Sequence, residues 1–440
     1  QSMAPMLSLC LCFILFCLGP LAEGGQWAST ARGGAPRDCT GVEKLTTLEP
    51  TQRVDSEAGY TEYFNDTDVQ FRCSGFAAHR QTISRDGFLK PHYSNSPRVI
   101  YVIQGSGLYG LAIPGCPENQ RGVDGDQHQK INKFSKGDVI VIPAAIVSWF
   151  FNNGEIPIIT INFLDTGNSA NQLDGKRRIY FLAGNQHQVG NSWQGVFSGF
   201  EPNMLADSLG VSEELAKKFQ TPAQHNGEIV HLKNGLGLKP TFNNDQEEEE
   251  DRQRNRLKGL DQAFCSLKTK ENIDQSGDVE DPRAGILSNL NANKFPILDI
   301  VQISLTRAIM YKGACLVPHW SLNTHSAVYV TAGKGRIQLI DSEGRSAYDD
   351  ELGPGQMVIV PHTFVCIKQA TGETFEYISF KTHGAAMFNQ IIGKESLLRA
   401  LPAEVIMSSF RNLTKEDVKI LKEGDAASIV PPRSFLVASA

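Results

Sequence analysis

The chain contains the same pattern twice. Residues 87–152 and 314–368 each contain an extended apolar segment, two Gly turns and a Val/Ile-rich run that ends in Pro. The two copies read YVIQGSG (101–107) and KGDVIVIP (136–143), then YVTAGKG (329–335) and GQMVIVP (355–361). His92 and His319 precede these motifs at spacings that agree within one residue. An internal duplication of this kind predicts two copies of one structural unit.

Each copy consists of short apolar or alternating runs broken by Gly, Pro and Asn, which is typical of many short antiparallel strands in a sandwich or closed barrel. Helical spacing of apolar residues follows each copy, over residues 202–219 and 396–421. Ser212 is placed to cap the second part of the first helical segment. Thr414 and Asp417 form a capping-box pattern in the second segment. We therefore predict a mainly β chain with two small barrels, each followed by a helical arm.

The N-terminal sequence and the charge limit the cellular context. The apolar run of residues 7–18, followed by small residues, predicts a secretory signal peptide over residues 1–25. No later segment is long and apolar enough to predict a membrane span. The formal net charge of −6 argues against a nucleic-acid partner. The sequence thus predicts a protein of the secretory pathway that has no membrane anchor once the signal is removed.

Cysteines and sequons fit that pathway. Three cysteines lie inside the predicted signal, and the rest of the chain keeps six: Cys39, Cys73, Cys116, Cys265, Cys315 and Cys366. An even set in an oxidising compartment suggests disulfides, but spacing alone leaves their connectivity open. Asn65 and Asn412 each begin an Asn-x-Thr sequon and are candidates for glycosylation.

Composition divides the chain into segments. After the signal, residues 26–38 are predicted to be a disordered leader, and residues 39–238 the first module. Residues 239–258 carry an acidic run without apolar content and are predicted to be a solvated linker. Residues 259–425 form the predicted second module, and residues 426–440 a Pro-containing tail.

Longer motifs identify a family resemblance across nearly the whole chain after the signal. They include NQLDGKRRIYFLAGNQ (171–186), VFSGFEPNML (196–205), GLDQAFCSLKTKENI (259–273), LVPHWSLNTHSAVYV (316–330), FEYISFKTH (375–383) and SLLRALPAEVI (396–406). This ordered set resembles the legumin-type (11S) seed storage globulins of the cupin superfamily. The resemblance implies a non-catalytic bicupin with two jelly-roll barrels. It further implies that copies form a homotrimer, and possibly a hexamer, as a nutrient reservoir in the protein storage vacuole.

The resemblance also assigns disulfides and a processing region. It implies that Cys39 pairs with Cys73, and that Cys116 and Cys265 join an acidic to a basic chain after a protease cuts between them. The family is usually cut between Asn and Gly before the GLDQAFC-like motif, where this chain has Lys258-Gly259. Asn243, Asn244 and Asn255 lie in the same linker, and Asn234-Gly235 is a further Asn-Gly pair before it. The cleaved bond, and the choice between trimer and hexamer, therefore remain open.

The first copy has few metal ligands. Catalytic cupins bind a divalent metal through His-x-His, a Glu and a later His, and an open site needs about three protein ligands. In the first copy these positions fall on His92, Ser94, Arg98 or Val99, and Ser148. A single donor beside an Arg predicts no metal here, and we expect no cofactor.

The second copy keeps more donors. The four positions fall on His319, Ser321, Ser326 and Cys366, and a third donor would need His325 or His362 to turn inward. His319 and Cys366 are thus weak candidate ligands for Cu or Zn. A cupin that binds such a metal, or a small apolar ligand, in its second barrel is the alternative function.

Other catalytic patterns fail. Gly105-Ser106-Gly107 and Gly333-Lys334-Gly335 resemble parts of a phosphate loop, but they connect strand to strand without a following helix. We predict that they are hairpin turns. The sequence has no Gly-x-Ser-x-Gly nucleophile elbow. These patterns predict that the protein is not an enzyme.

Overall fold

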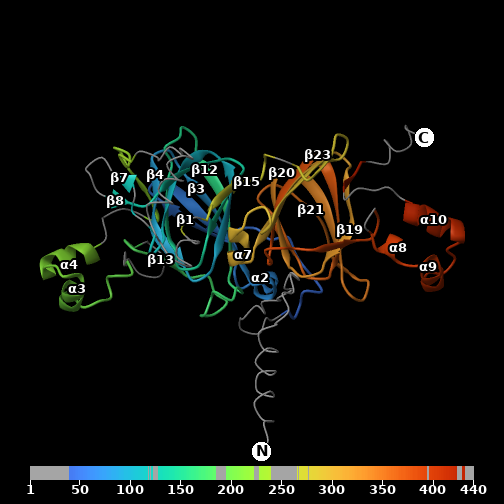
Figure 1. Ribbon diagram of the computed structural model, residues 1–440, viewed down its shortest axis with the longest axis horizontal. Coiled ribbons are helices and arrows are strands. Elements are labelled where there is room, and N and C mark those ends of the chain that lie inside the picture. The colour runs from blue at the N-terminus through green and yellow to red at the C-terminus, as the bar shows by residue number, and fades with distance from the viewer. Residues whose placement is uncertain are drawn as a thin grey trace, which may run out of the picture. The chain divides into compact units, whose positions relative to one another are not determined.

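A computed structural model describes most of the two predicted modules (Figure 1). The described residues are 39–116, 118, 120–121, 127–184, 195–221, 227–238, 265, 267–275, 277–393, 396–423 and 429–431. They all belong to one compact unit, residues 33–440. The predicted signal, leader and linker, including Asn255, Lys258 and Gly259, lie outside the described residues.

Two antiparallel sheets form the first barrel. Their strands are β1 (Gln52–Ser56), β2 (Gly59–Tyr63), β3 (Phe76–Ile83), β4 (Gly87–Ser94), β5 (Arg98–Gln104), β6 (Ser106–Ala112), β9 (Ile131–Ser135), β10 (Asp138–Ile142), β11 (Val147–Phe151), β12 (Ile158–Asp165), β13 (Ile179–Phe181), β14 (Ile229–His231) and β15 (Lys270–Asn272). One sheet has the order β1-β2-β3-β12-β5-β10-β15, and the other has the order β13-β4-β11-β6-β9 with β14 beside β4. A separate pair joins β7 (Gln120–Arg121) to β8 (Gln127–His128).

In the second barrel, the strands are joined into one ten-stranded sheet. Its strands are β16 (Val279–Asp281), β17 (Gly285–Leu290), β18 (Ser304–Tyr311), β19 (Cys315–Ser321), β20 (Ser326–Ile340), β21 (Ser346–Leu352), β22 (Met357–Val360), β23 (Val365–Lys381), β24 (Phe388–Gln390) and β25 (Ile429–Val430). Their order is β16-β17-β18-β23-β19-β24, with β20 beside β21, β22 and β23, and β25 beside β19. The prediction of a mainly β chain with two barrels is confirmed.

The Gly-x-Gly segments are corners at which the strands change partners. Gly105 separates β5, which pairs with β10 and β12, from β6, which pairs with β9 and β11. At Gly333 the long strand β20 shifts register and continues to a new partner, β21. A Cβ at Gly333 would lie 1.9 Å from the carbonyl oxygen of Thr374. The predicted hairpins are therefore wrong, because the turn signal of these glycines reflects close backbone approach and positive φ rather than a chain reversal.

Apolar side chains fill three layers. In β10, Val139 faces a core shared by both barrels, and the next residue, Ile140, faces the interior of the first barrel. In β22, Met357 faces the shared core and Val358 the interior of the second barrel. Successive side chains of a strand point to opposite faces, so a strand buried on both sides reads as a continuous apolar run. This explains why the VIVIP and MVIVP segments do not alternate with polar residues.

Aromatic rings join the barrels across the shared core. The rings of Phe163 in β12 and Phe380 in β23 stack with centroids 3.8 Å apart. The ring of Phe64 meets that of Tyr329 edge-on at 6.5 Å. Apolar burial of this kind contributes roughly 25 cal/mol per Å². The two barrels therefore pack against each other as parts of one core.

Each barrel also pairs with a segment from the other half of the chain. Residues 45–48, which precede the first barrel, cross to the second, where Leu48 and Met357 exchange both backbone hydrogen bonds at 2.7 and 2.9 Å. In return, β15 pairs with β10 of the first barrel although it follows the linker. These exchanges mean that neither half completes its sheets alone.

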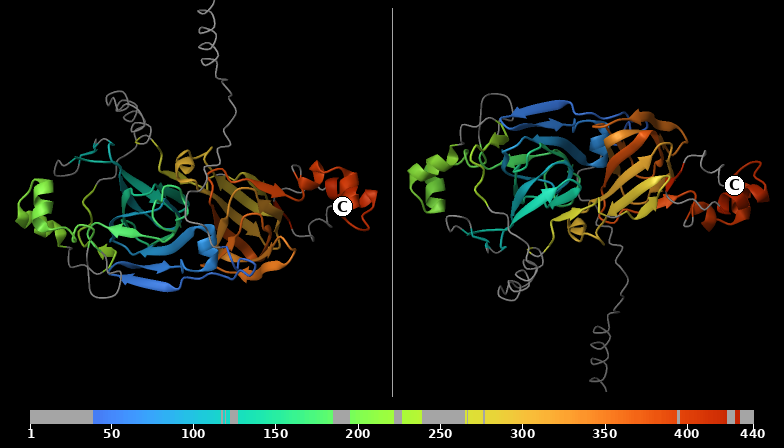
Figure 2. Two further views of the ribbon diagram at one scale, coloured as in Figure 1. Left: turned by 90° about the horizontal axis from the view of Figure 1, so that it is seen from below. Right: turned by 90° about the horizontal axis from the view of Figure 1, so that it is seen from above.

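The predicted helical arms are present. They comprise α3 (Pro202–Leu209) and α4 (Glu213–Gln220), then α8 (Leu397–Ala400), α9 (Ala403–Ser409) and α10 (Lys415–Glu423). Ser212 accepts a hydrogen bond from the Leu215 amide, and the Asp417 amide donates to Thr414 Oγ1 at 3.2 Å, so both predicted caps are confirmed. Figure 2 shows α3 and α4 beyond the first barrel and α8–α10 beyond the second. No helix in the described ranges is long and apolar enough to cross a membrane.

Candidate functional site

In the first barrel, a guanidinium occupies the position of the cupin metal ligands. Backbone pairing of β4 with β11 brings His92 opposite Ser148, and β5 supplies Arg98. Arg98 donates to His92 Nε2 and to Ser148 Oγ, both at 2.5 Å. Because Nε2 accepts, Nδ1 carries the proton and donates to the Lys90 carbonyl at 2.8 Å. The structure thus assigns the position that the sequence left between Arg98 and Val99.

The charge of Arg98 determines the chemistry of this site. Burial, followed by the neighbouring Arg98, lowers the pKa of His92 to about 3, so the imidazole is neutral at neutral pH. Burial also lowers the pKa of Arg98, to about 10, which leaves it charged. A metal cation at His92 would have to displace a guanidinium that two hydrogen bonds hold in place. These residues do not fit a metal.

In the second barrel, the predicted residues meet at a cavity of about 160 Å³. His319 in β19 pairs with Cys366 in β23, and both line this cavity with Ser321 and Ser326. His319 Nδ1 donates to the Val317 carbonyl at 2.8 Å. The structure therefore brings the four predicted positions together.

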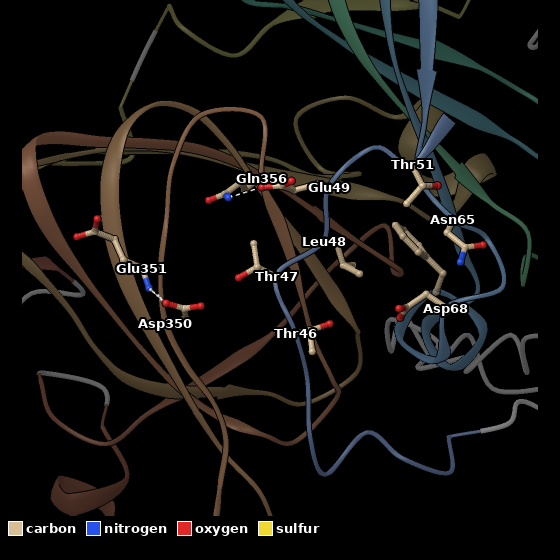
Figure 3. Close-up of a pocket in the computed structure, with 11 residues that line it drawn as sticks. Thr46, Thr47, Leu48, Glu49, Thr51, Asn65, Asp68, Asp350, Glu351 and Gln356 are labelled. Atoms are coloured by element: carbon tan, nitrogen blue, oxygen red, sulfur yellow. Dashed lines mark hydrogen bonds between the residues drawn. The ribbon is translucent and has the colours of Figure 1, made fainter. Parts of the chain in front are cut away.

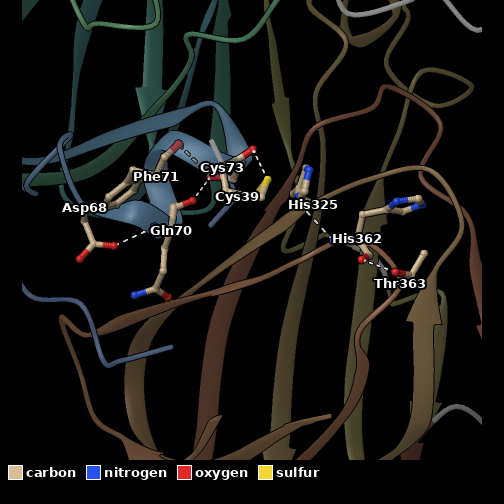
Figure 4. Close-up of a disulfide and its surroundings, with 9 residues drawn as sticks. Cys39, Asp68, Gln70, Phe71, Cys73, His325, His362 and Thr363 are labelled. Atoms are coloured by element: carbon tan, nitrogen blue, oxygen red, sulfur yellow. Dashed lines mark hydrogen bonds between the residues drawn. A yellow bond between two sulfur atoms is a disulfide. The ribbon is translucent and has the colours of Figure 1, made fainter. Parts of the chain in front are cut away.

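The two further histidines do not complete a metal site. His325 and His362 are not among the residues that line the cavity. Instead, the His362 amide donates to His325 Nδ1 at 3.2 Å, as the dashed line in Figure 4 shows, and His362 Nε2 donates to the Leu322 carbonyl. In the part of the chain that the structure describes, no group of three or more His, Cys, Asp or Glu side chains could hold a metal ion.

Two lysines that sequence reasoning missed also line this cavity. Lys368 and Lys381 both come from β23 and are each 5% exposed. Burial and then these two cations lower the pKa of His319 to about 3. A signal for Lys368 was available, because it lies in phase with Cys366 and Ala370 on the buried face of an alternating strand. Their charge disfavours a bound cation, so the Cu or Zn alternative is not favoured.

Two disulfides connect distant segments. Cys39 is bonded to Cys73 at the end of α2 (Val69–Ser74), as Figure 4 shows, and Cys116 is bonded to Cys265 across 149 residues. These are the two pairs that the family resemblance implies. Cys315 and Cys366 are free thiols. Burial raises the pKa of Cys315 above its usual value, so this thiol is a poor nucleophile at neutral pH.

A second hollow lies where the exchanged segment meets the second barrel (Figure 3). Its volume is about 400 Å³, and its lining includes Glu49, Asp68, Asp350 and Glu351 without a basic residue. Gln356 Nε2 donates to Glu49 Oε1 at 2.6 Å and fastens the segment to the barrel. The hollow therefore follows from the crossing of this segment to the second barrel.

Both sequons are on the surface. Asn65 is exposed, and its Oδ1 accepts hydrogen bonds from the Thr67 amide at 3.1 Å and hydroxyl at 2.7 Å. Asn412 is also exposed, but the Thr414 hydroxyl of its sequon is bonded to Asp417 as part of the helix cap. The Thr67 hydroxyl therefore bonds to the Asn of its own sequon, whereas the Thr414 hydroxyl bonds to a residue outside its sequon.

The sequence is similar to a protein family and to seed proteins of plants. The sequence model of the Cupin family matches residues 45–217 and 271–419. Cocosin 1 from Cocos nucifera is 39% identical over 97% of both chains. Glutelin type-B 4 from Oryza sativa subsp. japonica is 37% identical over 97% of this chain and 95% of that protein.

Solved structures agree with the sequence relatives. The crystal structure of the coconut allergen cocosin has a TM-score of 0.80 at 41% identity and covers 89% of this chain and 99% of its own. Recombinant pro-11S globulin of pumpkin has a TM-score of 0.80 at 34% identity and covers 90% of this chain and 100% of its own.

Proposed function

The chain belongs to the cupin family as a legumin-type 11S seed storage globulin, and from this membership we propose that its role is that of a nutrient reservoir. Such a protein is useful through its mass, its packing and its later degradation, and it needs no catalytic site. The observation that carries the proposal is the likeness to cocosin over 97% of both chains. The guanidinium at His92 and the two lysines beside His319 support a non-catalytic role.

Self-association is part of this proposal. The arms expose apolar side chains on both helical groups, including Leu215 (51%) and Phe219 (53%) on α4 and Phe410 (56%) and Ile420 (63%) at the other end of the chain. Contact between the first arm of one copy and the second arm of the next would cover these surfaces and, if the ring closes, give a cyclic oligomer. We propose a homotrimer, which a second trimer could extend to a hexamer.

Proteolytic maturation is also part of this proposal, and the second disulfide supports it. The linker of residues 239–258 lies between Cys116 and Cys265 along the chain. A protease that cut in the region of Asn255, Lys258 and Gly259 would leave an acidic and a basic chain joined by this bond. We further propose delivery through the secretory pathway to the storage vacuole, with Asn65 and Asn412 as candidate glycosylation sites.

The reserve function is tested by following the protein through the life of its source tissue. Quantitative mass spectrometry of maturing, mature and germinating tissue should show accumulation to a major protein and then loss on germination. A low amount that stays constant through germination would contradict a reserve role. Metal analysis of the same purified protein should find much less than one metal ion per chain.

A further inference from the structure

The cavity of the second barrel combines apolar walls with buried positive charge. The cavity has a volume of about 160 Å³, and most of its lining residues belong to β17, β19, β23 and β24. Apolar wall residues include Leu287, Val317, Trp320, Phe364 and Phe388. The residues that line it include Lys368 and Lys381 but no Asp or Glu. Phe388 is 38% exposed, which places an aromatic ring at the border between the cavity and solvent.

Neither lysine has a carboxylate partner in the described part of the chain, and Lys368 is instead hydrogen-bonded to the side chain of Cys366. Lys381 donates to Thr306 Oγ1, and Thr306 donates to Asn289 Oδ1 at 2.5 Å, so the hydrogen-bond partner of Lys381 is neutral. Lys368 lies over the ring of Tyr377, with Nζ 5.7 Å from the centroid. By contrast, exposed lysines of the same barrel, such as Lys312, pair with carboxylates. Burying an ammonium group without an anion is costly, so Lys381, whose contacts are all neutral, leaves the cavity able to accept a negative charge.

The electrostatics agree with this geometry. Burial and then repulsion from Lys368 lower the pKa of Lys381 to about 7. Burial opposes the charge on Lys368 as well, but the adjacent Cys366 and Tyr377 hold its pKa above the usual value. An anion between the two amines would favour the charged form of both.

We propose that the second barrel binds a small monocarboxylate, with its carboxylate at Lys368 and Lys381 and its apolar part against Trp320 and Phe388. The volume sets the size, because a cavity of about 150 Å³ accommodates benzene. A single ring or a short aliphatic chain therefore fits. A phosphate would place several charged oxygens against apolar walls and lose their hydration without enough donors. The proposal goes beyond the reserve function, which requires no ligand.

We do not expect an anionic ligand at Arg98 in the first barrel, although this residue is also a buried cation. Arg98 donates to His92 and Ser148, so acceptors of the protein itself already use two of its donor groups. Lys368 and Lys381 instead face a cavity whose lining offers them no carboxylate. The partners of Arg98 are neutral as well, so the difference between the two barrels lies in the free space beside the cation: Lys368 and Lys381 line a cavity, whereas Arg98 lines neither of the two cavities described above.

The test is isothermal titration calorimetry on the full-length protein, with benzoate as the probe and benzamide as its neutral counterpart. We expect benzoate to bind once per chain and benzamide at least about tenfold more weakly, since hydrogen bonds to charged groups are the stronger class. Naphthoate, with two fused rings, should also bind more weakly than benzoate. Equal affinity for benzoate and benzamide, or no heat from benzoate at about 1 mM, would overturn the proposal.

Substitutions locate the site. Lys381→Met and Lys368→Met keep much of the side-chain length and should each weaken benzoate binding by about tenfold to a hundredfold. Lys312→Met, at an exposed lysine of the same barrel, should leave the affinity unchanged. Replacing a buried cation by an apolar group is often neutral or stabilising, so both cavity variants should fold, which unfolding curves without ligand will check. Unchanged benzoate affinity in both cavity variants would reject the assignment, whatever the outcome of the tissue measurements.

Discussion

At the residue scale, buried positive charge distinguishes the interior of these barrels. Arg98 lies at His92 in the first barrel, and Lys368 and Lys381 lie beside His319 in the second. Each cation disfavours a bound metal, but the partners differ. Arg98 is held by side chains of the protein, so its contribution to stability can be measured directly.

Arg98→Leu should lower the free energy of unfolding by about 2–3 kcal/mol, because His92 Nε2 and Ser148 Oγ would lose a charged donor while staying buried. Urea unfolding measures this loss. The double variant Arg98→Leu/His92→Leu should recover part of it, since the second change removes the unpaired acceptor. Additive losses in the double variant would show that the Arg98–His92 hydrogen bond contributes no coupling.

The neutral state of His92 predicts acid sensitivity. Its folded pKa of about 3 lies below the unfolded value of about 6.5, so the unfolded chain binds a proton that the folded chain refuses as the pH falls. The stability from His92 is complete above pH 6.5 and is lost progressively toward pH 3. His92→Gln should therefore flatten the fall in unfolding free energy between pH 6.5 and 4 by up to about 1.4 kcal/mol per pH unit. His362→Gln, at an exposed histidine, is the matched control; identical pH profiles for wild type and His92→Gln would contradict the assignment.

At the scale of elements, the helical arms leave apolar side chains exposed within a single chain. Leu205 of α3 and Ala216 of α4 are buried between the two helices, while Leu215 and Phe219 on α4 are about half exposed. The helices are locally well specified, since Ser212 caps α4 and Glu213 pairs with Lys217. Their outer face is therefore available to another copy without a change in the helix itself.

Leu215→Asp combined with Phe219→Asp should convert the proposed trimer to monomer, because two charges would have to be buried at the contact. Light scattering coupled to size-exclusion chromatography reads out the mass. The control Glu214→Ala/Lys218→Ala removes an exposed ion pair of the same helix and should leave the oligomer intact. A trimer that survives the double Asp variant would exclude this face as the contact.

At the scale of the whole molecule, the two halves depend on each other. Leu48 adds a backbone bridge to the second barrel, β15 adds a strand to the first, and Phe163 stacks on Phe380 between them. The disulfide Cys39–Cys73 ties the chain just before residues 45–48 to α2. Covalent continuity through the linker is thus one of several connections between the halves.

Protein cut within residues 239–258 should run as one band on denaturing gels without reductant and as two bands with it, because Cys116–Cys265 spans the cut. Under native conditions, reduction should not separate the chains, since the shared core and exchanged strands still hold them. Size-exclusion chromatography of the cut, reduced protein tests this. Elution as two separate chains would mean that the disulfide, rather than packing, joins the halves.

The sequence by itself determined the repeated barrel, the capped helical arms and the family, because these depend on local periodicity, capping residues and ordered motifs. Only the tertiary structure decided that the strands change partners at Gly105 and Gly333 instead of reversing in a hairpin. It likewise decided that residues 45–48 pair with the second barrel and β15 with the first. It also decided that Lys368 and Lys381 face a cavity. A local sequence pattern indicates that a side chain or a stretch of backbone is buried. Which surface covers it depends on strands that are distant in the chain. The pairing of those strands is fixed only when the two barrels pack against each other.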